Sequence, residues 1–429
     1  MENNSRRHIQ TEPYKGVRDF YPKDMQIKKG VFANIQKTVE GYGYEEYDAS
    51  ILEPSNLYLA KTGEEIVNEQ TYSFVDRGGR NVTLRPEMTP SLARMIAGKR
   101  KELLFPIRWY SIPNLFRYEK PQRGRLREHY QLNADLFGGD ELMADTEILS
   151  LASSILKNFG ATEEDFTIKI NNRKLLNEIL TSLEISNEDA DKILKILDKK
   201  NKLAYETYKQ TLLKILGDKM NLMLNILDKP DELSKRFATS ESYISIQDTI
   251  NSLKNIGINN VVLDPYLTRG FDYYTALIFE VYDTDEKNNR SMFGGGRYDN
   301  LMDIFGVDRI NAVGFGMGDV TLNDFLQEHN LMPKIISSGD IYICLLEKKY
   351  FEEANKLASE LRNSNIKVEI DISKKKIGDQ LKVAVKKNIP YVICIGENEV
   401  KEKTYPLKNL KEKSETKLSL EEIIDTLNK

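Results

Sequence analysis

The stretch from Phe116 to Gly138 alternates polar and apolar residues, which predicts two strands joined by a loop. Successive side chains of a strand point to opposite faces. Five polar side chains therefore share one face of these strands: Arg117, Glu119, Gln131, Asn133 and Asp135. The apolar side chains share the other face: Phe116, Tyr118, Leu132, Ala134 and Leu136. If the apolar face packs on the core, the polar groups line one surface.

The loop between these strands is basic and contains Gly124. Its positive side chains are Lys120, Arg123, Arg125 and Arg127. Such a loop suits a polyanion, for which a triphosphate and an RNA end are both candidates. The alternative is a solvated hairpin with a charged tip, and residue spacing alone does not decide between the two.

A carboxylate at a predicted strand-to-helix corner is the second candidate. In the sequence from Thr83 to Thr89, Thr89 is a plausible N-cap, and Pro90 fits the first helical position. Helix capping therefore explains Thr89 and Pro90, but it does not explain Glu87. A carboxylate at such a corner could receive an ammonium group.

The residues from 267 to 282 combine a cation with two tyrosines. Arg269 precedes a glycine and a predicted strand, and its guanidinium offers a planar fork to carboxylates and phosphates. Tyr273 and Tyr274 each have an apolar ring and a hydroxyl. Taken alone, tyrosines on a strand are more often packing residues than site residues.

Glycines at alternate positions mark the fourth candidate. Gly314, Gly316 and Gly318 remove the side chains from one face of a predicted strand that follows the GGGRYDNL segment at 294–301. A flat ligand such as adenine could then approach the backbone. Neither a phosphate-binding GxxxxGK[ST] loop nor a dinucleotide-binding GxGxxG motif is present.

The composition excludes several classes of protein. The chain of 429 residues is 40% hydrophobic and 30% charged, as in soluble globular proteins. No apolar run approaches the ~18 residues of a membrane helix, and the polar residues 1–8 lack the apolar core expected of a secretory signal. Two isolated cysteines and three scattered histidines predict no zinc site. We therefore expect a cytoplasmic protein without membrane association.

Changes in periodicity predict three regions. Residues 1–325 read as an α+β domain, interrupted at 172–258 by a block of amphipathic helices. After a linker at Gln327–Gly339, residues 340–429 alternate strand and helix, which predicts a mostly parallel sheet covered by helices. Residues 341–429 of this tail carry a net charge of +3 within a chain of net charge −4. The excess reflects either a lysine-rich composition or a module that contacts phosphates.

Taken together and in order, these segments resemble the class II aminoacyl-tRNA synthetases, and within them the histidyl-tRNA synthetase family. The resemblance covers nearly the whole chain. Gly16–Pro22 is similar to the family's N-terminal signature, and the helix up to Gly43 with Pro54 to its dimer-forming motif 1. Phe116–Gly138 looks like motif 2. The segments TRGFDYYT at 268–275 and GGGRYD at 294–299 are diagnostic of the histidine enzymes.

The resemblance implies a fold, partners and residue roles. It implies a catalytic domain built on an antiparallel sheet, a helical insertion and an α/β anticodon-binding domain. It implies a homodimer that uses ATP, with Mg²⁺ and without zinc, to join L-histidine to tRNA(His). The residues implied to bind histidine are Glu87, Thr89, Arg117, Gln131, Asp135, Arg269, Tyr273 and Tyr274. Those implied to bind ATP are Arg117, Glu119, Arg125, Gly316 and Gly318.

Two of these residues are implied to be catalytic, and two others to meet the tRNA acceptor end. Arg269 and Arg117 would stabilise charge at the α-phosphate, while Gln122 and Arg127 would contact the tRNA. An alternative reading is a non-catalytic relative that serves as a regulatory subunit of ATP-phosphoribosyltransferase. Such relatives generally lack the 268–275 segment and the anticodon-binding tail, both of which are present in this sequence.

The sequence departs from the family pattern in motif 3. A Glu-Arg pair usually follows the glycines, and its arginine meets the γ-phosphate. Here Asp319, Val320, Thr321 and Leu322 follow Gly318. Arg123 and Arg309 are the two alternatives for that role, and a different mode of holding the triphosphate is the third.

Overall fold

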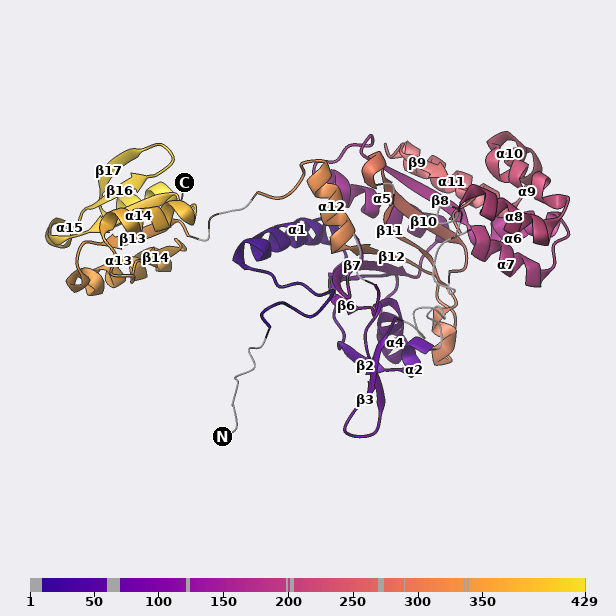
Figure 1. Cartoon of the computed structure of the whole chain (residues 1–429), viewed down its shortest axis with the longest axis horizontal. Coiled ribbons are helices and arrows are strands. Elements are labelled where there is room, and N and C mark those ends of the chain that lie inside the picture. Colours follow the sequence, from indigo (N-terminus) through magenta and orange to yellow (C-terminus); the bar gives the residue numbers. More distant parts are fainter. Residues whose placement is uncertain are drawn as a thin grey trace, which may run out of the picture. The chain divides into compact units, whose positions relative to one another are not determined.

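The computed structural model describes residues 10–59, 70–120, 124–197, 200, 204–268, 274–288, 290–334, 337 and 339–428. The chain divides into two compact units, residues 1–333 and residues 334–429 (Figure 1). Each unit has its own sheet and its own buried core. No helix in these described ranges is long and apolar enough to cross a membrane.

A nine-stranded sheet organises the first unit. Its strands run in the order β1-β5-β7-β12-β11-β10-β8-β9, with β6 paired to β7. They are β1 (Glu45–Glu46), β5 (Ile107–Ser111), β6 (Asn114–Phe116), β7 (Glu128–Phe137), β8 (Phe166–Asn172), β9 (Val261–Leu263), β10 (Leu277–Asp283), β11 (Ser291–Arg297) and β12 (Ala312–Gly318). The central pairs are antiparallel, and the edge pairs β1·β5 and β8·β9 are parallel. The α+β fold class with an antiparallel sheet is therefore confirmed.

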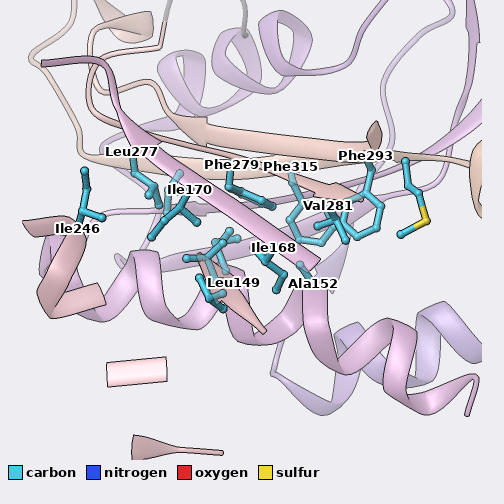
Figure 2. Close-up of a cluster of buried hydrophobic side chains, with 14 of the residues drawn as sticks. Leu149, Ala152, Ile168, Ile170, Ile246, Leu277, Phe279, Val281, Phe293 and Phe315 are labelled. Atoms are coloured by element: carbon cyan, nitrogen blue, oxygen red, sulfur yellow. The ribbon is translucent and has the colours of Figure 1, made fainter. Parts of the chain in front are cut away.

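One face of this sheet is apolar and covered by helices. Leu149 and Ala152 from α5 (Glu141–Asn158) and Ile246 from α11 (Glu241–Asn255) pack against it (Figure 2). The strand residues that meet them include Ile168, Ile170, Phe279, Val281, Phe293 and Phe315. Two further helices of this unit are α1 (Pro22–Gly41) and α12 (Asp319–Glu328). The strand residues that alternate with these apolar residues point to the opposite face of the nine-stranded sheet, which we call the polar face.

Helices fill the chain between β8 and β9. They are α6 (Arg173–Ser182), α7 (Asn187–Leu197), α8 (Tyr205–Leu216), α9 (Lys219–Asp228), α10 (Pro230–Phe237) and α11. The first five gather beside the β8–β9 edge of the sheet (Figure 1). By contrast, α11 packs on the sheet with α5, although it falls within the predicted helical block at 172–258. Its role in the fold is to cover the sheet.

A small sheet holds the strand-to-helix corner. Its strands are β2 (Leu52–Pro54), β4 (Asn81–Leu84) and β3 (Tyr72–Val75), in that order, beside α2 (Asn56–Leu59) and α4 (Thr89–Lys99). The N-cap of α4 is Met88, so Thr89 is the first helical residue and Pro90 the second. The prediction that Thr89 is the N-cap is therefore wrong by one residue.

The second unit is a five-stranded sheet in the order β14-β13-β15-β16-β17. Its elements are β13 (Ile341–Leu345), α13 (Phe351–Asn363), β14 (Val368–Ile370), α14 (Ile377–Lys386), β15 (Tyr391–Ile395), α15 (Glu397–Glu402), β16 (Tyr405–Asn409), β17 (Ser414–Leu418) and α16 (Leu420–Leu427). The first three strands in sequence pair in parallel, whereas β16 and β17 add antiparallel pairs. The α/β class is confirmed, and the antiparallel extension was not predicted.

Candidate active site

Strand β7 carries the centre of the candidate site. Its buried side chains Leu132, Ala134 and Leu136 belong to the apolar core. The alternate residues Gln131, Asn133 and Asp135 therefore point to the polar face, as the alternation predicts. They pair with the glycines of β12, Gly318 with Gln131, Gly316 with Asn133 and Gly314 with Asp135.

The first arm of the predicted hairpin does not follow the predicted alternation. Strand β6 ends at Phe116, and the side chain it buries completely is Leu115. Tyr118 is 49% exposed, and its backbone N–H donates to the carbonyl of Gln70. The prediction that Tyr118 packs on the core is therefore wrong, because the chain leaves β7 after Phe116.

The glycines make room for the side chains of β7. A Cβ atom at Gly314 would lie 2.1 Å from Asp135 Oδ1, and one at Gly316 would lie 2.8 Å from Gln131 Cδ. At these two positions the side chains of β7 therefore occupy part of the space that the glycines leave. At Gly318 the nearest described atom would be Thr321 Oγ1, at 3.8 Å. Strand β12 is thus accessible near its end.

Asp135 is a buried carboxyl with two different oxygens. The hydroxyl of Tyr298 donates to Oδ1. Oδ2 is buried and has no hydrogen-bond partner among the described residues. Burial raises the pKa of Asp135 to about 7, and the hydrogen bond from Tyr298 opposes that rise. Asp135 therefore changes charge near neutral pH, with one oxygen left for a ligand.

This raised pKa predicts a pH effect on stability. The folded protein holds the Asp135 proton more tightly than the unfolded chain does, so the stabilisation is fully present below pH 3.8 and is lost as the pH rises through about 7. We expect the melting temperature of wild type to fall relative to that of Asp135→Asn between pH 5 and pH 8. Thermal unfolding of both proteins measures the difference. A difference that does not change with pH would contradict the raised pKa.

Glu87 lies at the corner between β4 and α4, and it is buried. Tyr274 stands close to it: burial raises the pKa of Tyr274, and the charges of Glu87, Asp135 and Glu280 raise it further. Tyr274 therefore lies among three carboxylates on the polar face. Negative charge concentrated in this way suits a cationic or N–H-bearing ligand.

Arg117 brings positive charge to the same corner. Its Nε donates to the carbonyl oxygen of Pro86 at 2.9 Å, one residue before Glu87. Glu119 follows and forms an ion pair with Arg125, 3.3 Å from Nη1 to Oε2. Arg117 and Glu119, the predicted cation and carboxylate, thus both lie at the start of the basic loop.

Arg127 contacts the N-terminal segment. Its guanidinium carbon lies 4.0 Å from the ring centroid of Tyr118, and its Nη1 donates to the hydroxyl of Tyr14 at 2.9 Å. Its backbone N–H donates to the carbonyl of Gly16. Three predicted site residues, Gln122, Arg269 and Tyr273, lie outside the described residues, as does Arg123.

The sequence reasoning missed His129. It has the same parity on β7 as Gln131, so it points to the polar face. Burial lowers the pKa of His129 to about 3, and the charges of Arg117 and Arg18 lower it further. The imidazole of His129 is therefore neutral at physiological pH, within the field of two arginines. The strand parity could have identified it, but the three histidines were judged only as metal ligands.

Comparisons with known proteins find relatives that match nearly the whole chain. Residues 16–320 match the family model described as histidyl-tRNA synthetase, and residues 340–429 match the model of an anticodon-binding domain. The chain is 44% identical over 428 residues to a histidine–tRNA ligase of Leptospira biflexa, covering 98% of both proteins. A histidine–tRNA ligase of Thermoplasma volcanium is 37% identical, covering 98% of this chain and 99% of the relative.

The chain belongs to the histidyl-tRNA synthetase family. A solved histidyl-tRNA synthetase from a Nostoc species has the same fold, with a TM-score of 0.82 and 21% identity over 98% of this chain and 99% of its own. A Bacillus halodurans structure described as an ATP phosphoribosyltransferase regulatory subunit/histidyl-tRNA synthetase is similar in fold, with a TM-score of 0.74 and 23% identity. It covers 90% of this chain and 99% of its own.

Asp319 follows the glycines at the place where the resemblance implies a Glu-Arg pair. The Oδ2 of Asp319 lies 2.7 Å from Nη2 of Arg18, and its Oδ1 accepts the N–H of Tyr130. Arg309, one alternative for the missing arginine, is paired with Asp299 at 2.9 Å. Asp299 also accepts the N–H of Ala312, where β12 begins, roughly 20 Å of strand from Gly318. Arg309 is therefore held near the start of β12, whereas Gly318 lies at its end. This separation argues against Arg309 as the replacement for the motif 3 arginine.

Metal ligands are a separate matter. Among the described residues, no group of three or more His, Cys, Asp or Glu side chains is arranged to hold a metal ion. The thiols of Cys344 and Cys394 are free, and these residues pair across β13 and β15. Cys344 is buried, and Cys394 is partly buried.

Proposed function

We propose that this protein is a histidine–tRNA ligase that activates L-histidine with ATP and transfers it to tRNA(His). The observation that carries the proposal is the group of buried carboxyls, Glu87 and Asp135, around Tyr274 on the polar face. A histidine molecule brings an ammonium group and an imidazole N–H, which both need acceptors. Membership of the family supports the same reaction.

The reaction needs no protein base to begin. The histidine carboxylate is ionised at neutral pH and attacks the α-phosphorus of ATP, the bond to the β-phosphate breaks, and pyrophosphate leaves. A terminal hydroxyl of the tRNA then attacks the carbonyl carbon, and AMP leaves. Both steps develop negative charge on phosphate or carbonyl oxygens, so fixed cations are the main catalytic groups. We propose Arg117 and Arg269 for this role.

The remaining site residues divide by ligand. For the amino group and ring of histidine we propose Glu87, Thr89, Gln131, Asp135, Tyr273 and Tyr274. For ATP, accompanied by Mg²⁺, we propose Arg117, Glu119, Arg125, Gly316 and Gly318. For the tRNA acceptor end we propose Gln122 and Arg127. The stacking of Arg127 on Tyr118 holds Arg127 at the base of this loop.

The test of the function is ATP–pyrophosphate exchange with each amino acid in turn. We expect exchange with histidine and none above background with the others. Exchange with a different amino acid would assign another synthetase, and no exchange with any would favour the regulatory alternative. We further propose that the protein works in the cytoplasm as a homodimer, without zinc; sedimentation of the purified protein tests the dimer.

The second unit is predicted to serve the tRNA and not the activation step. We propose that residues 340–429 bind the anticodon, with the net charge of +3 on residues 341–429 facing phosphates. A chain that ends at Ser338 should keep histidine-dependent exchange if it folds and dimerises. It should lose charging efficiency at least about tenfold, the effect of losing about 1.4 kcal/mol of tRNA binding. Equal charging by the truncated and full-length proteins would remove this unit from tRNA recognition.

A further inference from the structure

The register of three strands brings two unassigned hydroxyls to the polar face. Strand β1 pairs in parallel with β5, and Tyr47 continues that pairing through its N–H to the carbonyl of Tyr110, 2.8 Å away. Strand β5 pairs with β7, so that Trp109 faces Asp135 and Ser111 faces Asn133. Tyr110 is buried on the apolar side. Tyr47 and Ser111 therefore point to the polar face.

Three buried oxygens in this region lack hydrogen-bond partners among the described residues. They are Tyr47 Oη, Ser111 Oγ and Asp135 Oδ2. The residues that carry them are only 8%, 1% and 2% exposed. An unsatisfied buried polar group destabilises the fold, so proteins keep few of them without a reason. A bound ligand that supplies the missing partners is such a reason.

The register places the three side chains near one another on the polar face, and the effects on the pKa of Tyr47 agree with it. Burial raises the pKa of Tyr47, and the charge of Asp135 raises it further. The nearby hydroxyl of Ser111 opposes that rise, although neither hydroxyl has the geometry of a hydrogen bond. Of the other groups that act on Tyr47, Arg85 opposes the rise and Asp48 adds to it. The three oxygens thus form one polar cluster.

Aromatic side chains surround this cluster. Tyr47 packs beside Trp109, with ring centroids 5.7 Å apart, and Tyr298 packs edge-on against Phe137 at 5.8 Å. Tyr274 packs against the same group of buried residues. A few polar atoms within an apolar and aromatic lining are typical of a site for a small, flat ligand.

We propose that Tyr47 and Ser111 are specificity-determining residues for the substrate side chain: with Asp135 Oδ2, their hydroxyls form a three-oxygen site for a planar ring that carries an N–H donor and an sp² nitrogen acceptor. This proposal rests on the function proposed above, in which that ring is imidazole. The carboxylate oxygen of Asp135 accepts a hydrogen bond from the ring N–H. The hydroxyls of Tyr47 and Ser111 supply the other hydrogen-bond donors and acceptors that the polar atoms of the ring need. A ring without N–H leaves all three oxygens unpaired, which is how such sites reject analogues.

Two opposite effects are expected when a hydroxyl is removed. In the free protein, Tyr47→Phe or Ser111→Ala deletes an unsatisfied group, so the melting temperature should rise or stay constant. In the complex, the same substitution deletes a ligand contact, so histidine should bind more weakly. A purely structural hydroxyl, bonded to an ordered water, gives the reverse: a lower melting temperature and unchanged histidine binding.

The experiment measures the histidine KM and kcat of pyrophosphate exchange, with the melting temperature of the free enzyme. Each single variant should raise KM about 3- to 10-fold, the range for a neutral hydrogen bond, with a smaller change in kcat. The preference for histidine over thienylalanine, whose ring lacks N–H, should fall by a similar factor. The double variant should lose more than either single variant.

Matched controls exist elsewhere in the first unit. Tyr208 Oη in α8 and Ser153 Oγ in α5 are also buried without described partners, away from the polar face. Tyr208→Phe and Ser153→Ala should change the melting temperature as the test variants do, with an unchanged histidine KM. Unchanged KM in the Tyr47 and Ser111 variants of an active enzyme would overturn the inference. A wild type without histidine-dependent exchange would instead overturn the proposed function.

Discussion

Replacing Arg269 with alanine should slow histidyl-adenylate formation about 100-fold or more. Removing one preorganised donor to a developing negative charge typically costs about 2.7–4 kcal/mol. In the sequence Gly270 follows Arg269, and glycine permits backbone conformations that other residues rarely adopt. The measurement is the single-turnover rate at saturating histidine and ATP, which separates chemistry from binding.

The companion variant Arg269→Lys separates charge from geometry. An ammonium keeps the charge but cannot bridge two oxygens with a planar fork, so it should restore only part of the rate. A wild-type rate in the alanine variant would rule out Arg269 as the catalytic cation. A loss confined to histidine affinity would assign the main electrostatic role to Arg117, whose Nε is fixed by the carbonyl of Pro86.

Glu87→Ala should raise the histidine KM about 10- to 150-fold. A hydrogen bond to a charged group contributes roughly 1.5–3 kcal/mol, and the buried ammonium of histidine would lose its carboxylate. The side chain of Glu87 is only 2% exposed, so water cannot easily replace it. The KM of histidine in pyrophosphate exchange measures the effect. The KM of Glu87→Gln should lie between those of wild type and Glu87→Ala.

Glu53 supplies a matched control for this substitution. It is also a buried glutamate, 2.7 Å from the Nη2 of Arg94, but it lies on β2. Glu53→Ala should lower the melting temperature, because it leaves a cation without its partner, and it should leave the histidine KM unchanged. If Glu87→Ala behaves like Glu53→Ala, then Glu87 is a residue of the corner and the histidine site lies elsewhere.

Sequence periodicity predicted the centre of the fold better than its edges. The alternation of Gln131, Asn133 and Asp135 with apolar residues is strong because β7 is long and one of its faces is buried. Strand β17 gives no such signal, since most of its residues are exposed and charged or polar. The N-cap of α4 was predicted one residue too late. Threonine is a common N-cap residue, whereas the actual N-cap, Met88, has no side chain that can cap the helix.

The site was predictable only where its residues lie on strongly patterned segments. Tyr47 and Ser111 could not be found in this way, because their proximity depends on the pairing of β1 with β5, some sixty residues later in the chain. The sequence shows the alternating glycines of β12, but it does not show why glycine is needed there. Only the register shows that the side chains of β7 occupy the space that the glycines leave.

That register also restricts how the site can be redesigned or diverge. A methyl group at position 314 would collide with Asp135, and one at position 316 with Gln131. Neither glycine can therefore change unless the facing side chain shortens or moves in the same step. The restriction is stricter between β10 and β11, where a Cβ at Gly296 would lie 2.5 Å from the backbone carbonyl oxygen of Leu277, which no substitution can shorten. Enlargement of the site must come from β7, whose side chains can be shortened, because these strands have no volume left to give up.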